Sequence, residues 1–439
     1  MQALLRRLLP RGVGTLVRAS VIGQLATLVA MPLLTRWCSL GDFGLLQLYG
    51  TVTTVAGLVA CLRYDYAILQ PADQTTAKRL VLLALLVALG AGLVTLGVVP
   101  LLTWSLRSTG WKELVRLTPV VAISVAATGM ASAATQWLIR QGQFDALARS
   151  RWIQSVLVAV LQLGGAVAGL GGHGLILGDA IGRLVGLAFL LQSAHLFGNL
   201  PGEGAGPAAL ARLGRDYLRF PAVAAPSALI NAVGFSLPVF FVERFYGTTG
   251  LGVFSLLERV MGVPTLFIGQ PLSQTFIHRL RESLPGGPAS NQGEIRRTVG
   301  ISALFGSVPF LALALAGPFL FTLVFGGRWA GAGGLAQMLA VPYFVSFVFW
   351  PVMPTLIILN RLRTQMTWET ARVLGMLALA AAASSGRVPL DYMVAMIVLL
   401  MSSFSLVHFW LCYSAAGRGI PPSLAGSAVI GPAEIVRDS

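Results

Sequence analysis

Charged residues are scarce in this chain. They make up 11% of 439 residues, whereas a soluble domain carries about 25%, and 56% of the residues are hydrophobic. Several runs contain no Asp, Glu, Lys or Arg and are longer than the roughly 20 residues that cross a bilayer core, among them 80–106, 152–178, 298–327 and 329–360. A water-facing surface cannot be built from so few charges, so a soluble fold is excluded. The sequence predicts an all-α polytopic membrane protein.

Other chemistry-bearing groups are also few. The three cysteines, Cys38, Cys61 and Cys412, are widely spaced and form no CxxC pattern, and the four histidines show no ligand spacing, which argues against a disulfide framework or a metal site. No GxxxxGK[ST] motif occurs, so an ATP-driven motor is excluded. The predicted loops are too short for an extramembrane catalytic domain. We therefore expect a protein that is not an enzyme and has no cofactor, apart from a coupling proton or sodium ion.

Twelve apolar segments are long enough to be considered as spans, although the eleventh is short. The first follows Arg6 and Arg7 as a signal peptide would, but its length and the lack of a nearby small-x-small site favour a retained helix. The predicted spans are 13–35, 43–62, 80–104, 117–139, 152–170, 174–197, 220–242, 251–277, 298–325, 334–359, 370–385 and 390–413.

Basic residues are distributed unequally between the two sets of loops. If the N-terminus is cytoplasmic, 21 Lys and Arg lie on the cytoplasmic side and 7 on the other, and the cytoplasmic set includes Arg212, Arg215, Arg219 and Arg372. Cytoplasmic loops retain an excess of Lys and Arg, so both termini are expected to be cytoplasmic. The net charge of +15 then reflects membrane topology and does not indicate nucleic acid as a partner.

The chain is predicted to consist of two six-helix halves. A Pro- and Gly-rich break at 198–219 forms a cytoplasmic linker between lobes 1–197 and 220–413, and a cytoplasmic tail follows at 414–439. Arg36 precedes Gly44 by eight residues at the start of the second span, and Arg244 precedes Gly252 by eight at the start of the eighth. Either this spacing reflects a parallel internal repeat, which is a transporter architecture, or it is a chance similarity of two short turns.

Five charged residues lie more than one helical turn inside predicted spans, where each costs at least about 2.5 kcal/mol. Asp179 and Arg183 are four apart and share a helix face, either as a structural ion pair or as a pair that opens when an anion or a proton arrives. Glu258 and Arg259 are adjacent and point in different directions, so at least one needs another partner. Glu258 and Asp179 are candidates for ion coupling, and Arg259 for binding an anion. Arg18 either reaches the cytoplasmic surface or lines a cavity.

Several stretches of the sequence are specific enough to compare with known families. They include "GTLVRASVIGQLATLVAMPLLTRWCSLGDFGLLQLYGTV", "LRYDYAILQP", "LLERVMGVPTLFIGQPLSQTFIHRL" and "FGGRWAGAGGLAQMLA". These stretches resemble the Wzx-type polysaccharide biosynthesis proteins, the oligosaccharide flippases of the MOP superfamily. The resemblance covers most of residues 12–370, and its most specific parts are the "LTRxxxxxDFG" turn and the "ERVMGVPxxxIGQ" stretch. It implies a MATE-like bundle of two six-helix lobes arranged in a V, in a bacterial inner membrane.

The resemblance also implies a substrate and a site. Such proteins move undecaprenyl-pyrophosphate-linked oligosaccharides to the periplasmic leaflet for O-antigen, capsule or exopolysaccharide synthesis, beside a polymerase and a chain-length regulator. Related flippases line a cavity with arginines on spans one, two and eight. Arg18 and Arg259 fall in comparable places, Arg36 and Arg63 match more loosely, and span two has no internal Arg.

The sequence therefore predicts an alternating-access flippase, with membrane lipids and a lipid-linked oligosaccharide as partners. Candidate substrate-binding residues are Arg18, Arg36, Arg63, Arg183 and Arg259. A MATE-like ion-coupled exporter of small cationic compounds is the alternative, but it would need an acidic cavity, and three of the five charges within spans are basic. A glycan polymerase or transferase would need catalytic carboxylates outside the membrane, where only Asp42, Glu113, Glu243 and Asp391 are expected.

Overall fold

Every regular element that the structure describes is a helix. The structure, a computed structural model, describes residues 29–106, 109–195, 206–384 and 388–418, and no strand occurs within these ranges. The described helices divide between two compact units, and the division falls inside one long helix, between Leu256 and Leu257. The all-α prediction is confirmed, whereas the predicted lobe boundaries stay a prediction.

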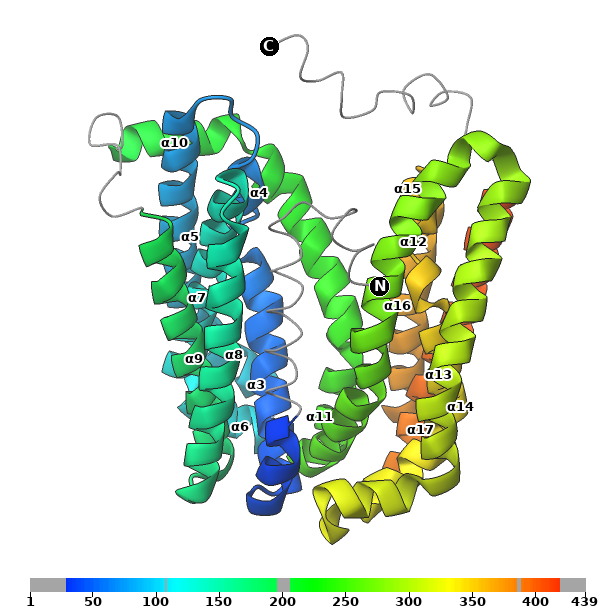
Figure 1. Cartoon of the computed structure of the whole chain (residues 1–439). Helices are drawn as coiled ribbons and strands as arrows, with labels where there is room; N and C mark the ends of the chain where they lie inside the picture. The colour runs from blue at the N-terminus through cyan, green and yellow to red at the C-terminus, as the bar shows by residue number, and fades with distance from the viewer. Residues whose placement is uncertain (1–28, 107–108, 196–205, 385–387, 419–439) are drawn as a thin grey trace. The chain divides into compact units, whose positions relative to one another are not determined.

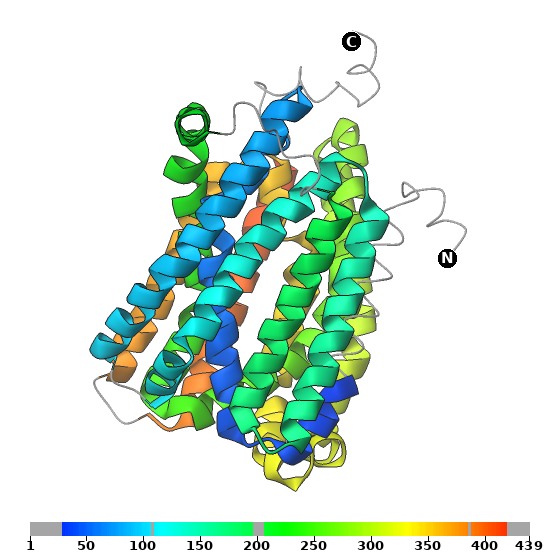
Figure 2. The same cartoon turned by 90° about the vertical axis from the view of Figure 1, so that its left-hand side faces the viewer.

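The first unit contains the described residues up to Leu256 together with Thr322–Trp329. A helical segment at 29–37 precedes α3, and the long helices α5, α7, α8 and α9 run side by side (Figures 1 and 2). The elements are α3 (Leu40–Val59), α4 (Tyr64–Ala67), α5 (Gln74–Leu106), α6 (Thr109–Arg116), α7 (Thr118–Arg140), α8 (Phe144–Val167), α9 (Gly171–Ser193), α10 (Pro207–Asp216), η1 (Phe220–Ala224), most of α11 (Ala225–Pro264) and η4 (Gly327–Trp329).

The second unit contains Leu257–Phe321 and the described residues from Ala330 onward. It begins with the end of α11. The other elements are η2 (Thr265–Gly269), α12 (Gln270–Ser283), η3 (Leu284–Gly286), most of α13 (Gly287–Phe325), α14 (Ala330–Phe349), η5 (Trp350–Val352), α15 (Thr355–Ile358), α16 (Leu362–Ser384) and α17 (Leu390–Gly417).

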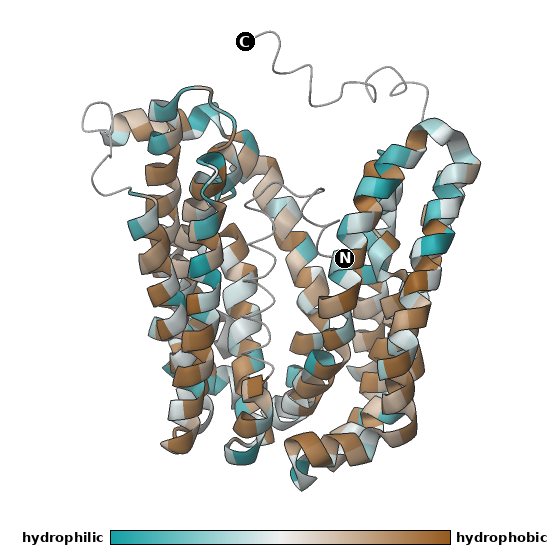
Figure 3. Cartoon of the chain, viewed as in Figure 1, coloured by the Kyte–Doolittle hydropathy of each residue, from teal (hydrophilic) through white to brown (hydrophobic). Residues whose placement is uncertain are grey.

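The helices have the length and hydropathy of membrane spans. Hydrophobic residues predominate along the long helices, and hydrophilic residues gather near their ends (Figure 3). Six helical stretches of the described chain are long and apolar enough to cross a bilayer: Gln74–Leu101, Thr118–Arg140, Gly171–Ser193, Phe220–Phe325, Gly327–Ile358 and Leu390–Gly417. The fourth of these has 106 residues and covers three predicted spans. Each predicted span from the second to the twelfth overlaps one or more described helices, and the first has only its end in the described range.

The predicted seventh and eighth spans are joined by a sharp turn at Gly247. This residue has φ 66° and ψ −169°, a backbone conformation that glycine adopts far more readily than other residues. The turn breaks α11 into the two helices that hydropathy predicted, and it sets the start of the eighth span close to the start of α3. This placement brings α11 into close contact with α3.

The eleventh span is longer than its hydropathy suggests. The predicted eleventh span begins at residue 370, whereas helix α16 begins at Leu362 and has 23 residues. Arg372, which the charge count placed in a cytoplasmic loop, lies within this helix and is buried. Its guanidinium carbon lies 5.1 Å from the centre of the Trp368 ring, and that ring stacks on His408 of α17 at 4.1 Å. The helix starts early because its polar first half packs against α17.

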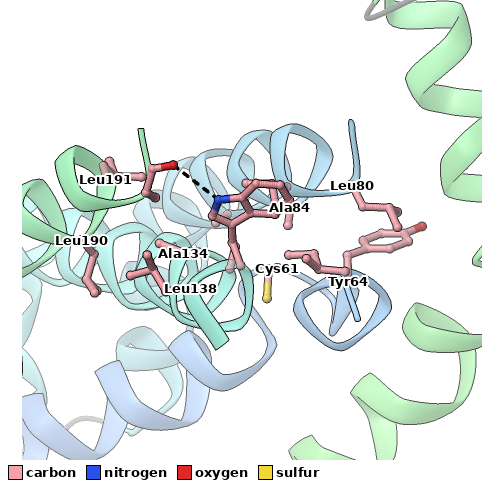
Figure 4. Close-up of a cluster of buried hydrophobic side chains, with 14 of the residues drawn as sticks. Cys61, Tyr64, Leu80, Ala84, Ala134, Leu138, Leu190 and Leu191 are labelled. Atoms are coloured by element: carbon pink, nitrogen blue, oxygen red, sulfur yellow. Dashed lines mark hydrogen bonds between the residues drawn. The ribbon is translucent and has the colours of Figure 1, made fainter. Parts of the chain in front are cut away.

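Each unit has its own apolar core. In the first, side chains of α4, α5, α7 and α9 form the cluster drawn in Figure 4, which includes Cys61, Tyr64, Leu80, Ala84, Ala134, Leu138, Leu190 and Leu191. Trp137 in this cluster donates its indole hydrogen to the carbonyl oxygen of Ala194 at 3.4 Å. The core of the second unit includes Phe276, Leu280, Ile295, Val352, Leu356, Leu359 and Cys412. These cores fix the helices that carry the charged residues discussed below.

Candidate functional site

Ser39 and Asp42 fix the start of α3, within the "DFG" turn that is among the most specific motifs of the sequence. The Asp42 Oδ2 atom accepts hydrogen bonds from the backbone and the hydroxyl of Ser39, each at 2.7 Å, and the Ser39 hydroxyl accepts from the Asp42 amide. This is a capping box, which satisfies amides that the first helical turn leaves open. The other oxygen, Oδ1, accepts from the backbone of Gly172 at 2.6 Å and so ties α3 to α9.

The two glycines of the sequence repeat lie at the contact of α3 with α11, within the first unit. A Cβ atom on Gly44 would lie 1.8 Å from the carbonyl oxygen of Thr248, and one on Gly252 would lie 1.8 Å from that of Leu40. Gly44 and Gly252 are 208 residues apart in the sequence, as are Leu40 and Thr248. The contact therefore follows the repeat, and each glycine allows the other helix to approach its backbone.

One further contact of the first unit follows the same repeat, and two others join the two halves of the sequence. The hydroxyl of Ser255 donates to Oε1 of Gln47 at 3.2 Å, and these two residues are also 208 apart. In the loop after the ninth span, Trp329 donates to the carbonyl oxygen of Thr35 at 3.2 Å. In the loop after the third span, the Trp111 ring stacks on the Phe240 ring, with 6.1 Å between the ring centres. Each half of the sequence therefore supplies an aromatic residue that packs on the other half.

Asp179 and Arg183 form an ion pair inside the helical bundle. The Nε atom of Arg183 donates to Oδ2 of Asp179 at 2.5 Å, and the two side chains are 23% and 18% exposed. A terminal guanidinium nitrogen of Arg183 also donates to the Thr128 hydroxyl of α7 at 3.4 Å. The partial exposure matters chemically, because it leaves the guanidinium accessible to a further acceptor.

Tyr49 and Ser124 extend this polar group toward α3. Their hydroxyls share a hydrogen bond at 2.7 Å, and the Thr128 hydroxyl donates to the carbonyl oxygen of Ser124 at 2.7 Å. We call these five residues, Tyr49, Ser124, Thr128, Asp179 and Arg183, the Arg183 cluster. Its three hydroxyl residues are not predicted by the sequence, because each lies in a different predicted span from the ion pair and no spacing rule connects them. The cluster combines a neutralised cation with hydroxyl groups, which suits the reversible binding of an anion.

Glu258 and Arg259 lie on α11, in the second unit. The Tyr343 hydroxyl of α14 donates a hydrogen bond to Oε1 of Glu258. The Glu258 side chain is exposed at the protein surface, and Arg259 is half-buried. Tyr343 is 85 residues away from Glu258 and is not among the site residues that the sequence predicts. The signal that could have found it is its position in the middle of an apolar span, where the interfacial preference of tyrosine does not explain it.

Arg36 and Arg63 lie beyond opposite ends of α3. This helix has 20 residues, which at 1.5 Å per residue separates its ends by about 30 Å, so the two arginines cannot bind the same phosphate group. The Arg36 side chain is exposed, and its carbonyl oxygen accepts from Arg328 at 3.1 Å. The Arg63 guanidinium lies 4.2 Å from the centre of the Tyr66 ring. Arg18 lies outside the described residues.

Arg63 has an electrostatic effect on its neighbour Asp65, beyond the end of the second span. Asp65 is buried, and this burial raises the pKa of its carboxyl group, while the positive charge of Arg63 acts in the opposite direction. Arg63 itself has φ 62°, an unusual value for a residue with a side chain. Its contacts with Tyr66 and Asp65 are local, so the structure connects Arg63 to the turn after α3 and not to the Arg183 cluster.

The fold is that of transporters of the MOP superfamily. An inward-facing multidrug resistance MATE transporter of this superfamily has a TM-score of 0.65 and 15% identity, with 92% of this chain and 95% of that chain covered. An outward-facing multidrug resistance MATE transporter of the superfamily has a TM-score of 0.62 and 14% identity, with 93% of this chain and 98% of that chain covered. A transporter of the superfamily from Pyrococcus furiosus is described as having a binding pocket of reversed polarity. It has a TM-score of 0.56 and 14% identity, with 92% of this chain and 96% of that chain covered. The chain is thus a multi-pass helical membrane protein with a transporter fold.

Sequence comparison identifies the family. The profile of the polysaccharide biosynthesis protein family matches residues 33–333, well over half of the chain, and the chain belongs to this family. It is also 23% identical over 161 residues to the teichuronic acid biosynthesis protein TuaB of Bacillus subtilis, an alignment that covers 36% of this chain and 33% of that protein. The chain thus spans about a third of the length of this curated relative. The expected family is confirmed, and so is the expected fold.

Proposed function

We propose that this protein is a flippase that moves an undecaprenyl-pyrophosphate-linked oligosaccharide from the cytoplasmic to the periplasmic leaflet of a bacterial inner membrane, with both termini cytoplasmic. The observation that carries the proposal is a partly exposed intramembrane arginine, Arg183, in a polysaccharide biosynthesis protein with a transporter fold. Moving the lipid-linked oligosaccharide between leaflets breaks and forms no covalent bond, so the proposed function is transport and not catalysis.

The charge of the substrate explains why such an arginine is useful. A pyrophosphate carries at least two negative charges, and these cannot enter hydrocarbon without compensating cations. In the proposed mechanism, Asp179 neutralises Arg183 when no substrate is bound. The guanidinium then exchanges part of this contact for phosphate oxygens, which its planar donors can bind in pairs. Arg259 and Arg18 are proposed as further ligands of the head group. The polyprenyl tail stays in lipid while the head group crosses.

A test of the transport step follows the substrate from one leaflet to the other. In a strain lacking this gene, we expect lipid-linked oligosaccharide to accumulate where only reagents on the cytoplasmic side can modify it. The readout is a membrane-impermeant glycan-modifying enzyme applied to right-side-out and inside-out vesicles, with a plasmid copy of the gene as the control. Normal periplasmic exposure of the oligosaccharide, together with increased susceptibility to small cationic compounds, would contradict the proposal and favour a MATE-like exporter.

We further propose that Glu258 couples transport to proton or sodium entry and that Tyr343 positions its carboxylate. Glu258→Gln is expected to lower export at least tenfold, because the amide cannot exchange a proton or balance a cation. Tyr343→Phe removes one hydrogen bond, worth about 1 kcal/mol, and is expected to lower export less than tenfold. Surface glycan per cell and the response of reconstituted transport to a pH or sodium gradient measure both effects.

Glu282→Gln is the matched control for these two variants, because it changes an exposed carboxylate of α12 in the same unit. It is expected to leave export unchanged. If Glu258→Gln retains export at the wild-type level and the same response to both gradients, Glu258 has no coupling role.

A further inference from the structure

Helix α10 has an apolar face that is docked on the core of the first unit. Leu210 is buried, and Leu213 and Tyr217 pack against the cluster of Figure 4. Because these residues are spaced by three and four, they share one face of a helix. The Tyr64 hydroxyl donates to the carbonyl oxygen of Gly214 at 2.9 Å and fixes the helix further. The docked position of α10 is therefore defined by both packing and a hydrogen bond.

The other face of α10 carries basic residues. Arg212 and Arg215 are three apart, Arg219 follows shortly after the helix, and all three side chains are exposed. None of the three forms an ion pair or a hydrogen bond through its side chain with any residue that the structure describes. Their charges are thus available to a partner outside the chain. We call the surface of Arg212, Arg215 and Arg219 the basic face.

Exposed apolar residues continue from the basic face. Leu218 is 55% exposed and Val223 is 63% exposed. Figures 1 and 2 show α10 lying crosswise at one end of the bundle, and it is seen end-on in Figure 2. A helix that lies across the ends of the spans, with arginines beside exposed apolar side chains, has the composition of helices that lie in the interface of a membrane. The distribution of basic residues along the sequence places this end of the bundle on the cytoplasmic side.

We propose that the basic face of α10 is a docking site for anionic phospholipid headgroups of the cytoplasmic leaflet. The arginines bind lipid phosphates, and Leu218 and Val223 enter the acyl region beside them. The proposal holds whichever substrate the protein transports, since none of these residues belongs to the Arg183 cluster or lies near Glu258 in the sequence. Phospholipid is the occupant that fits, because it offers phosphate and hydrocarbon at the same depth.

The test uses the full chain, purified in a neutral detergent and titrated with short-chain phosphatidylglycerol. Lipid binding is measured by native mass spectrometry and by the rise in the midpoint of thermal unfolding. Arg212→Gln/Arg215→Gln is expected to weaken binding roughly tenfold or more, since each basic residue near a charged lipid surface contributes substantially. Phosphatidylcholine, which has no net charge, is expected to bind weakly and to change the unfolding midpoint little, both for the wild type and for this variant.

The matched control is Arg149→Gln/Arg151→Gln, which removes two exposed arginines of α8 that are also predicted to be cytoplasmic. It is expected to bind phosphatidylglycerol as the wild type does. Equal weakening in both variants would attribute the binding to net charge and overturn the proposal. Binding of phosphatidylglycerol by the Arg212→Gln/Arg215→Gln variant at the wild-type level would also overturn the proposal. Tight binding of farnesyl diphosphate to the basic face, with no binding of phosphatidylglycerol, would identify the carrier lipid as the occupant and would also overturn it.

Discussion

Gly44→Ala is expected to destabilise the protein by about 3 kcal/mol, the upper end of the usual cost of overpacking, and to remove most folded protein from the membrane. The added Cβ would lie 1.8 Å from the carbonyl oxygen of Thr248 and 2.7 Å from its carbonyl carbon. Both atoms belong to backbone, so no side-chain rotation relieves the overlap, and the two helices must separate. The measurement is the yield of monodisperse protein together with its midpoint of thermal unfolding.

Gly50→Ala is the control for this prediction, because Gly50 lies in the same helix and a Cβ there would have no atom within 4 Å. Alanine is the better helix former by roughly 1 kcal/mol, so this variant is expected to be as stable as the wild type or slightly more stable. Gly252→Ala is expected to behave as Gly44→Ala does. Equal stability of the Gly44 and Gly50 variants would show that the α3 and α11 backbones are not in contact.

The second large effect is expected at the ion pair of α9. Removing one partner of a buried pair leaves the other charge uncompensated and destabilises a protein by about 3–5 kcal/mol. Arg183→Gln and Asp179→Asn each remove one charge, and the pair is only partly exposed, so we expect both to lower the midpoint of thermal unfolding. The double variant removes both charges and is expected to recover most of the lost stability. Unfolding of the purified proteins measures these differences.

Measurements of export distinguish the roles of Arg183 and Asp179, which measurements of stability do not. If Arg183 binds the pyrophosphate, Asp179→Asn keeps the cation and retains substantial export at equal protein level, whereas Arg183→Gln lowers it at least tenfold. The double variant is then expected to be stable but inactive. Recovery of export in the double variant would show that the pair has a structural role only.

Local spacing predicted part of the Arg183 cluster. Asp179 and Arg183 are four apart on one helix, and helical geometry alone brings their side chains together. Tyr49 and Thr128 come from other helices, and their approach depends on how α3, α7 and α9 pack, which hydropathy does not encode. The same limit applies to Tyr343, whose contact with Glu258 joins two helices that are far apart in the sequence. Spacing within a helix is therefore predictable here, and the partners across helices are not.

Hydropathy predicted the fold class and the succession of helices for a physical reason. The bilayer requires long apolar segments whose backbone groups are satisfied internally, so helices can be recognised one at a time. The same criterion failed at the start of α16. There, residues 362–369 are helical although the segment is polar, because Trp368 stacks on His408 of α17. A window average registers the polarity of this segment but not the neighbouring helix on which Trp368 packs.

The reciprocal packing of Gly44 on Thr248 and of Gly252 on Leu40 has a consequence for the origin of the chain. An interface in which residue i contacts j and the equivalent of j contacts the equivalent of i is isologous, and it is the interface that a symmetric dimer forms about a two-fold axis. Two copies of a six-helix ancestor could make this contact before their genes were fused. A change at the ancestral glycine would then have appeared twice in one interface. In the fused chain the two glycines can mutate separately, but each still fits only the backbone of the other copy.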